Sequence, residues 1–121
     1  MLILNHELLE KLEIKKIDSI KDVENSLPKA FLIVQDLQLA KFCFENSIAY
    51  CALVEGIKDS LFFVNLGAKY LLTKDLEFAK VLQNLAENYL FDSKILLAIK
   101  EESEIEKVAK SGIDGVIFWR E

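Results

Sequence analysis

The fold of this chain is decided by residues 46–73, which read NSIAYCALVEGIKDSLFFVNLGAKYLLT. The turn-forming pair Asn46-Ser47 leads into the apolar run Ile48–Val54. A segment with helical spacing follows, and a second apolar run begins after Gly67. An apolar run, a helical segment and another apolar run predict a βαβ unit, in which the two strands lie parallel in one sheet.

The same alternation extends in both directions along the chain. It predicts five main strands, with a helix between each successive pair, near residues 31–35, 49–54, 69–73, 94–99 and 114–118. Five such units are too few for a closed (β/α)8 barrel, which needs about 250 residues. We therefore expect one α/β domain over residues 1–121, with an open, doubly wound parallel sheet of the flavodoxin or receiver type and helices on both faces.

Residues 1–27 differ from the rest and are expected to form an N-terminal helical or edge extension packed on the domain, either as an integral flap or as an extra βα unit. Asn5 is a candidate cap for a short helix. The weak alternation over Leu12–Ile17 is compatible with an added edge strand. Ser19 followed by Asp22 resembles a capping box, so we expect a helix to begin there and to end before Pro28.

Composition limits the classes of partner. The net charge of -5 argues against a protein that binds duplex nucleic acid, which needs a basic surface. No apolar stretch approaches the roughly 18 residues of a membrane span. Cys43 and Cys51 form no CxxC motif and are expected to be reduced, buried thiols, so we expect a cytoplasmic protein. The hydrophobic fraction of 52% requires either two covered sheet faces or an apolar surface for a partner.

Two short segments resemble known families. Residues 67–74, GAKYLLTK, resemble the last strand of response-regulator receiver domains, in which a lysine at the strand end helps to hold a phosphoaspartate. No paired acids follow the first expected strand, so this resemblance implies a strand and not phosphorylation. Residues 103–118, SEIEKVAKSGIDGVIF, are similar to the closing units of phosphate-binding (β/α) barrels. In those barrels a glycine normally follows the last strand, whereas Trp119 follows it here, so the resemblance implies a strand position only.

The residues that usually carry catalysis are scarce. His6 is the only histidine, which leaves neither a metal-ligand set nor a base for a nucleophilic cysteine. The four glycines are explained by turns and helix ends, so no phosphate loop is expected. We expect no metal and no cofactor, and the sequence favours a non-catalytic protein.

The polar residues that follow the strands form the candidate ligand site. Ligands of open α/β sheets bind beyond the carboxyl ends of the strands. The ligand-binding candidates at this edge are Asp36, Glu55, Thr73, Lys74, Lys100 and Arg120. This mixture of charges suits a small polar or anionic ligand. The alternative is that such residues only cap helices, since Asp36 and Asp75 stand where helix N-caps belong.

The expected helix at residues 57–66 is apolar on all sides. Ile57, Leu61 and Val64 form one face, and Phe62, Phe63 and Leu66 are expected to point away from it. Either the N-terminal segment covers these three residues or a second subunit does. We expect a homodimer or another protein–protein contact at Phe62, Phe63 and Leu66, with binding of a small ligand as the alternative function.

Overall fold

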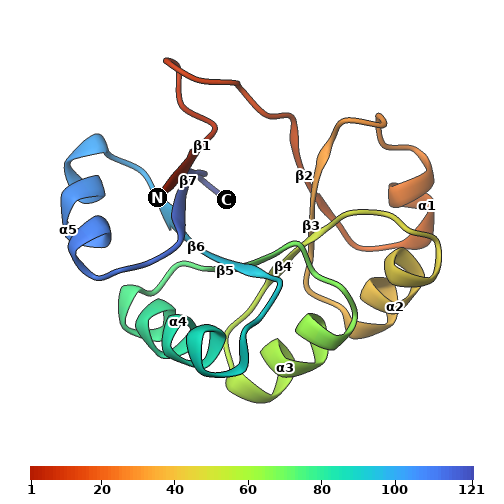
Figure 1. Ribbon diagram of the computed structural model, residues 1–121. Coiled ribbons are helices and arrows are strands. Elements are labelled where there is room, and N and C mark those ends of the chain that lie inside the picture. The colour runs from red at the N-terminus through yellow and green to blue at the C-terminus, as the bar shows by residue number, and fades with distance from the viewer.

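The computed structural model describes residues 1–121 and contains seven strands and five α-helices, shown in Figure 1. A short 3-10 turn, Glu102–Glu104, precedes the last helix. The elements in chain order are β1 (Leu2–Leu4), β2 (Ile14–Ile17), α1 (Ile20–Glu24), β3 (Phe31–Val34), α2 (Leu37–Glu45), β4 (Cys51–Leu53), α3 (Ile57–Asn65), β5 (Tyr70–Thr73), α4 (Leu76–Tyr89), β6 (Lys94–Ile99), α5 (Ile105–Lys110) and β7 (Gly115–Phe118). All the helices are too short or too polar to span a bilayer.

The seven strands form one sheet in the order β1-β7-β6-β5-β4-β3-β2, and every neighbouring pair is parallel. The five predicted main strands are therefore confirmed as β3 to β7, and the edge strand expected within Leu12–Ile17 is β2. Strand β1 was not predicted from the sequence. Asn5, expected to cap a helix, instead ends this strand with a left-handed backbone (φ 61°).

The expected doubly wound, flavodoxin-like topology is wrong. From β2 to β7 each strand pairs with the next strand along the chain, so the strand order does not reverse within this series. Because crossovers between neighbouring parallel strands are right-handed, helices that connect strands added in one direction all lie on the same face. The twist of the sheet then curls it around its uncovered, concave face.

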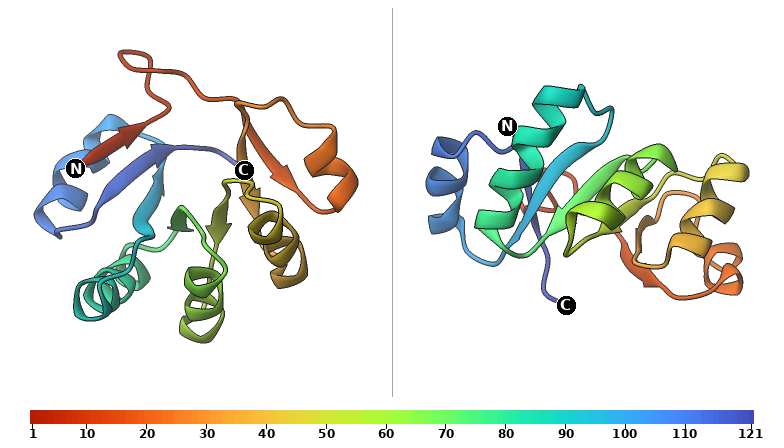
Figure 2. Two further views of the ribbon diagram at one scale, coloured as in Figure 1. Left: turned by 45° about the vertical axis from the view of Figure 1, so that its right-hand side comes forward. Right: turned by 90° about the horizontal axis from the view of Figure 1, so that it is seen from below.

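The two faces of the sheet are packed differently. A cluster of 22 buried residues lies between the convex face and the helices, which Figure 1 and the left view of Figure 2 show outside the curl. The concave face holds a second cluster of only six buried residues, all from strands: Ile33, Cys51, Leu53, Leu72, Leu96 and Ile117. The helices therefore cover one face, whereas the other is filled by strand side chains together with Leu12 of the β1–β2 connection and Trp119 after β7.

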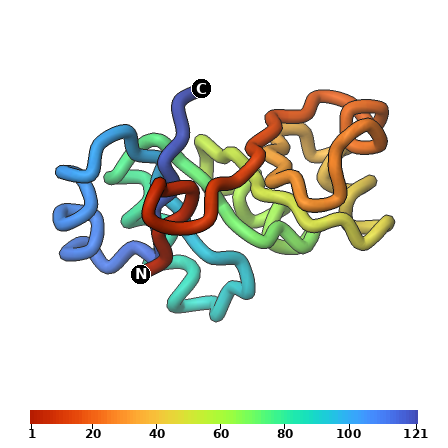
Figure 3. Tube along the Cα trace, turned by 90° about the horizontal axis from the view of Figure 1, so that it is seen from above, coloured from red at the N-terminus to blue at the C-terminus, as the bar shows by residue number.

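The curled sheet remains open between its edge strands, β1 and β2. Residues 5–13 connect these strands without a helix, and Figure 3 shows this red segment passing from the blue half of the molecule to the orange half. Asn5 anchors the connection, since its side-chain amide donates to the carbonyl oxygen of Phe118 at 2.8 Å and accepts from the N–H of Leu12 at 2.9 Å. Residues 1–27 thus contain the expected extra βα unit, β2 and α1, with β2 at the edge of the sheet, and in addition the strand β1.

Candidate functional site at the carboxyl edge

The candidate ligand residues follow parallel strands, so they lie at one edge of the sheet, the carboxyl edge. Asp36, Glu55, Lys74, Lys100 and Arg120 come after β3, β4, β5, β6 and β7 respectively. They do not form a single ring, because the curl of the sheet and residues 119–121 divide this edge into two hollows.

The smaller hollow, of about 220 Å³, lies at the ends of β3, β4 and β5. It brings together Glu55, Thr73 and Lys74, three of the six candidates, with Gln35 beside them. Thr73 is only 3% exposed, and its hydroxyl accepts a hydrogen bond from the N–H of Asp75 at 3.2 Å. The charged residues that line this hollow, Glu55, Lys74, Asp75 and Glu121, are all exposed.

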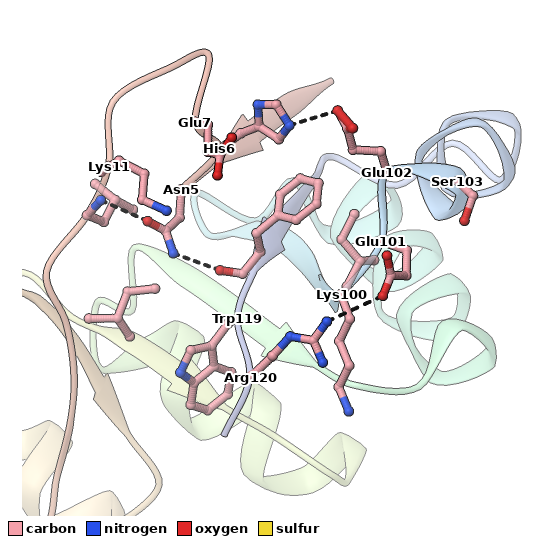
Figure 4. Close-up of a pocket in the computed structure, with 14 residues that line it drawn as sticks. Asn5, His6, Glu7, Lys11, Lys100, Glu101, Glu102, Ser103, Trp119 and Arg120 are labelled. Carbon is pink, nitrogen blue, oxygen red and sulfur yellow. Dashed lines mark hydrogen bonds and ion pairs between the residues drawn. The ribbon is translucent and has the colours of Figure 1, made fainter.

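The larger hollow, of about 850 Å³, lies at the ends of β1, β6 and β7 and is drawn in Figure 4. Lys100 and Arg120, two further candidates, line it together with Trp119. Residues 5–14 contribute the opposite side, including His6 and Lys11. This hollow carries both signs of charge.

Asp36 lines neither hollow and instead caps α2, since its carboxylate accepts a hydrogen bond from the N–H of Gln38 at 2.8 Å. Asp75 caps α4 in the same way, accepting from the N–H of Glu77 at 3.0 Å. Such caps satisfy backbone donors that the first turn of a helix leaves free. Both aspartates are thus helix N-caps, and Asp75 also lines the smaller hollow.

Two lysines from distant strands converge on one carboxylate at this edge. The ammonium groups of Lys16 on β2 and Lys74 after β5 both contact the side-chain carboxylate of Glu121. The Lys74 ammonium also lies 5.4 Å from the centre of the Trp119 ring, within the range of a cation–π interaction. The hydrogen bond from Lys16, followed by that from Lys74, lowers the pKa of Glu121.

An ion pair and a histidine–carboxylate hydrogen bond lie at the larger hollow, as Figure 4 shows. Arg120 contacts Glu101 at 3.3 Å, and Nε2 of His6 lies 2.9 Å from Glu102. Because Nδ1 of His6 accepts a hydrogen bond from the N–H of Leu8, Nε2 carries the ring proton and donates to Glu102. The cations Lys11 and Lys100 of this hollow form no ion pair.

Three residues at this edge were not predicted from the sequence: His6, Lys16 and Glu121. The strand-end rule was applied only to the five main strands, although Lys16 also stands near the end of an apolar alternation. The position of Glu121 depends on residues 119–121 turning across the sheet end, which no local pattern indicates.

Groups with evident nucleophilic or metal-binding chemistry are not part of the site. Cys43 and Cys51 are free and buried, and burial raises the pKa of both thiols. No three or more histidine, cysteine, aspartate or glutamate side chains lie together as a metal-binding group. The charged groups at the carboxyl edge suit electrostatic recognition of a polar ligand.

The three predicted interface residues have different environments. Phe62 is 54% exposed and Leu66 is partly buried, but Phe63 is only 1% exposed and packs in the core beside Tyr50. The placement of Phe63 on the outer face is wrong. On α3 that face consists of Phe62 together with Ile57 and Leu61.

The fold and the carboxyl edge thus provide the evidence on function. No protein-family model matches this chain, and no curated protein matches it at a significant level of similarity.

Proposed function

We propose that this protein binds a small anionic molecule at the carboxyl edge of the curled sheet, with Lys16 and Lys74 contacting a carboxylate or phosphate group of the ligand. The observation that carries this proposal is the convergence of these two ammonium groups on the Glu121 carboxylate. A carboxylate held between two cations occupies the position that an external anion would take. The free, buried cysteines are in keeping with a cytoplasmic location for this activity.

The smaller hollow next to this carboxylate supplies room for the rest of the ligand. Its volume of about 220 Å³ suits a molecule of a few heavy atoms. Glu55 and Gln35, which also line this hollow, offer acceptor oxygens, so hydroxyl or amino groups beside the anion fit the lining. We therefore favour small hydroxylated or aminated acids, or their phosphates.

Calorimetric titration with inorganic phosphate tests this proposal. Lys74→Gln and Lys16→Gln should each weaken binding, because each removes one of the two cations. Glu121→Gln should strengthen binding, because it removes the carboxylate that competes with the added anion. Lys58→Gln, a change at an exposed lysine of α3 that forms no ion pair, is the matched control and should leave the affinity unchanged.

The proposal fails if Glu121→Gln does not bind phosphate. It also fails if the changes at Lys16 and Lys74 alter the affinity no more than the change at Lys58 does. A lysine pair that only stabilises the tail of the chain would give the second of these results.

Self-association is a second candidate function, favoured by the exposed apolar residues of α3. Ile57, Leu61 and Phe62 are 45%, 37% and 54% exposed. The N-terminal segment does not cover them, since Leu8 and Leu9 are themselves exposed. Fully burying each such side chain in a homodimer contributes roughly 1.5–3 kcal/mol. Light scattering should then show a dimer that Phe62→Glu converts into a folded monomer, whereas a monomeric wild-type protein at high concentration would contradict this function.

A further inference from the structure

A third hollow, of about 320 Å³, lies at the amino ends of β3, β4 and β5. Nine of its twelve lining residues are hydrophobic, in contrast to the charged hollows at the carboxyl edge. Leu12 of the β1–β2 connection closes it from the opposite side and separates it from the larger carboxyl-edge hollow, since Leu12 lines both. Predominantly apolar hollows of this size are typical of small-molecule sites.

The space exists because the curled sheet is not closed at this level. In a small closed barrel, inward side chains from strands all round the ring fill the interior. Here β1 and β2 do not pair, and Leu4 and Leu12 are the only apolar side chains that β1 and the β1–β2 connection contribute to the hollow. At the amino end of the central strand β4 the inward residue is Cys51, whose side chain is small and leaves this end of the interior underfilled.

One wall of this hollow is aromatic. The rings of Phe31 on β3 and Tyr70 on β5 stack, with centroids 5.6 Å apart and planes inclined by 28°. Both side chains are only partly buried, so part of this wall is exposed. The exposed parts of these two rings give the hollow an aromatic wall against which an aromatic ligand can pack.

The rim of the hollow is positively charged. Its charged lining residues are two lysines, Lys29 and Lys69, and one acid, Glu10. Neither lysine forms an ion pair. The Lys69 ammonium lies 5.6 Å from the centre of the Tyr70 ring, so it stands directly beside the aromatic wall. A ligand whose ring contacts Phe31 and Tyr70 would place a negative group at the rim near Lys69.

We propose that this apolar hollow is a second binding site, specific for a small planar aromatic molecule that carries a carboxylate. The aromatic part packs against Phe31 and Tyr70, and the carboxylate pairs with Lys69 at the rim. The site is independent of the proposed anion site, because none of its lining residues contributes to the Lys16–Glu121–Lys74 contact.

The probe for this site is 2-naphthoate, with the uncharged 2-naphthamide for comparison, and binding is followed by amide NMR and calorimetry. We expect saturable binding of 2-naphthoate with shifts centred on Phe31, Cys51 and Tyr70. Lys69→Gln should weaken the binding of 2-naphthoate about three-fold, as expected for the loss of an exposed ion pair, and should leave the affinity for 2-naphthamide unchanged. Lys58→Gln should change neither affinity.

Ala49→Phe tests the cavity itself. Ala49 is an exposed lining residue just before β4, so a phenyl group there has space and should fill the hollow while the protein stays folded. This variant should bind neither 2-naphthoate nor 2-naphthamide and should keep the melting temperature of the wild-type protein. Binding that is unaffected by Ala49→Phe, shifts that lie elsewhere, or no saturable binding would overturn the proposal. Lys74→Gln should leave 2-naphthoate binding intact, which separates this result from that of the phosphate titration.

Discussion

The convex and concave faces of the sheet differ in how they are packed, although the same strands form both. On the convex face, helices bury 22 residues in a continuous core. On the concave face only six strand residues are buried, and the hollows lie at both ends of the strands. The convex face therefore supplies most of the hydrophobic stabilisation, while the concave face and its rims keep space and unpaired charge for binding.

The largest expected effect distinguishes the core side of α3 from its outer side. Phe63→Ala should lower the free energy of unfolding by about 3–5 kcal/mol, because it leaves a cavity in the convex core. Phe62→Ala, one residue away on the exposed side, should cost under about 0.5 kcal/mol. Urea unfolding of the two variants measures both values. Similar losses would mean that α3 does not face the sheet through Phe63.

A smaller loss of folding stability is expected when Asp114 is replaced, because its side chain links α4 to β6. Its carboxylate accepts from the N–H of Ile95 at 2.8 Å and from the side chain of Gln83 at 3.0 Å. Asp114→Ala should cost about 1–3 kcal/mol, since it leaves partly buried donors without partners. The control is Asp92→Ala, which changes an exposed aspartate close to Ile95 in sequence that forms no side-chain hydrogen bond. Both variants are unfolded in urea, and equal losses of stability would exclude this role for Asp114.

The concave face has little spare room where β1 joins the sheet. A Cβ added at Gly115 would lie 2.8 Å from the Cβ of Leu2 and 3.0 Å from its carbonyl oxygen. Gly115→Ala should therefore displace β1 and cost about 1–2 kcal/mol, with faster hydrogen exchange at Leu2 and Leu4. Gly56→Ala, where an added Cβ meets nothing within 4 Å, should show no such increase. Unchanged exchange in Gly115→Ala would contradict the close packing of β1.

The smallest effect concerns the titration of Glu121. Because its pKa is lowered in the folded protein, its contribution to stability is present above its ordinary pKa and is lost as the pH falls through the folded value. NMR titration of this carboxyl group should give a pKa below the ordinary glutamate range. Lys16→Gln should raise it, and Lys74→Gln should raise it less. An ordinary pKa in the wild-type protein would show that the lysines do not hold this carboxylate in solution.

Local patterns predicted most of the secondary structure. The apolar runs located β3 to β7, and Ser19 and Asp75 marked helix starts that the structure confirms. The strand order could not be read in this way, because alternation of strands and helices is the same whichever edge of the sheet each new strand joins. That single unknown decided whether the helices lie on one face or on both.

The candidate site was predictable only in part. The strand-end rule placed Glu55, Lys74, Lys100 and Arg120 at the correct edge, but it did not divide them between two hollows. The hollow beside Tyr70 at the other end was not predicted. It depends on the missing pairing between β1 and β2, which is a property of the whole sheet and not of any segment.

The most direct test of the binding role of the concave side is an amide NMR titration of the wild-type protein and of Glu121→Gln with inorganic phosphate. We predict saturable shifts confined to the carboxyl edge around Lys16, Lys74 and residues 119–121, reached at lower phosphate concentration in the variant. Shifts spread over the outer surfaces of the helices, or no saturable shift in either protein at millimolar phosphate, would contradict the assignment of binding to this edge.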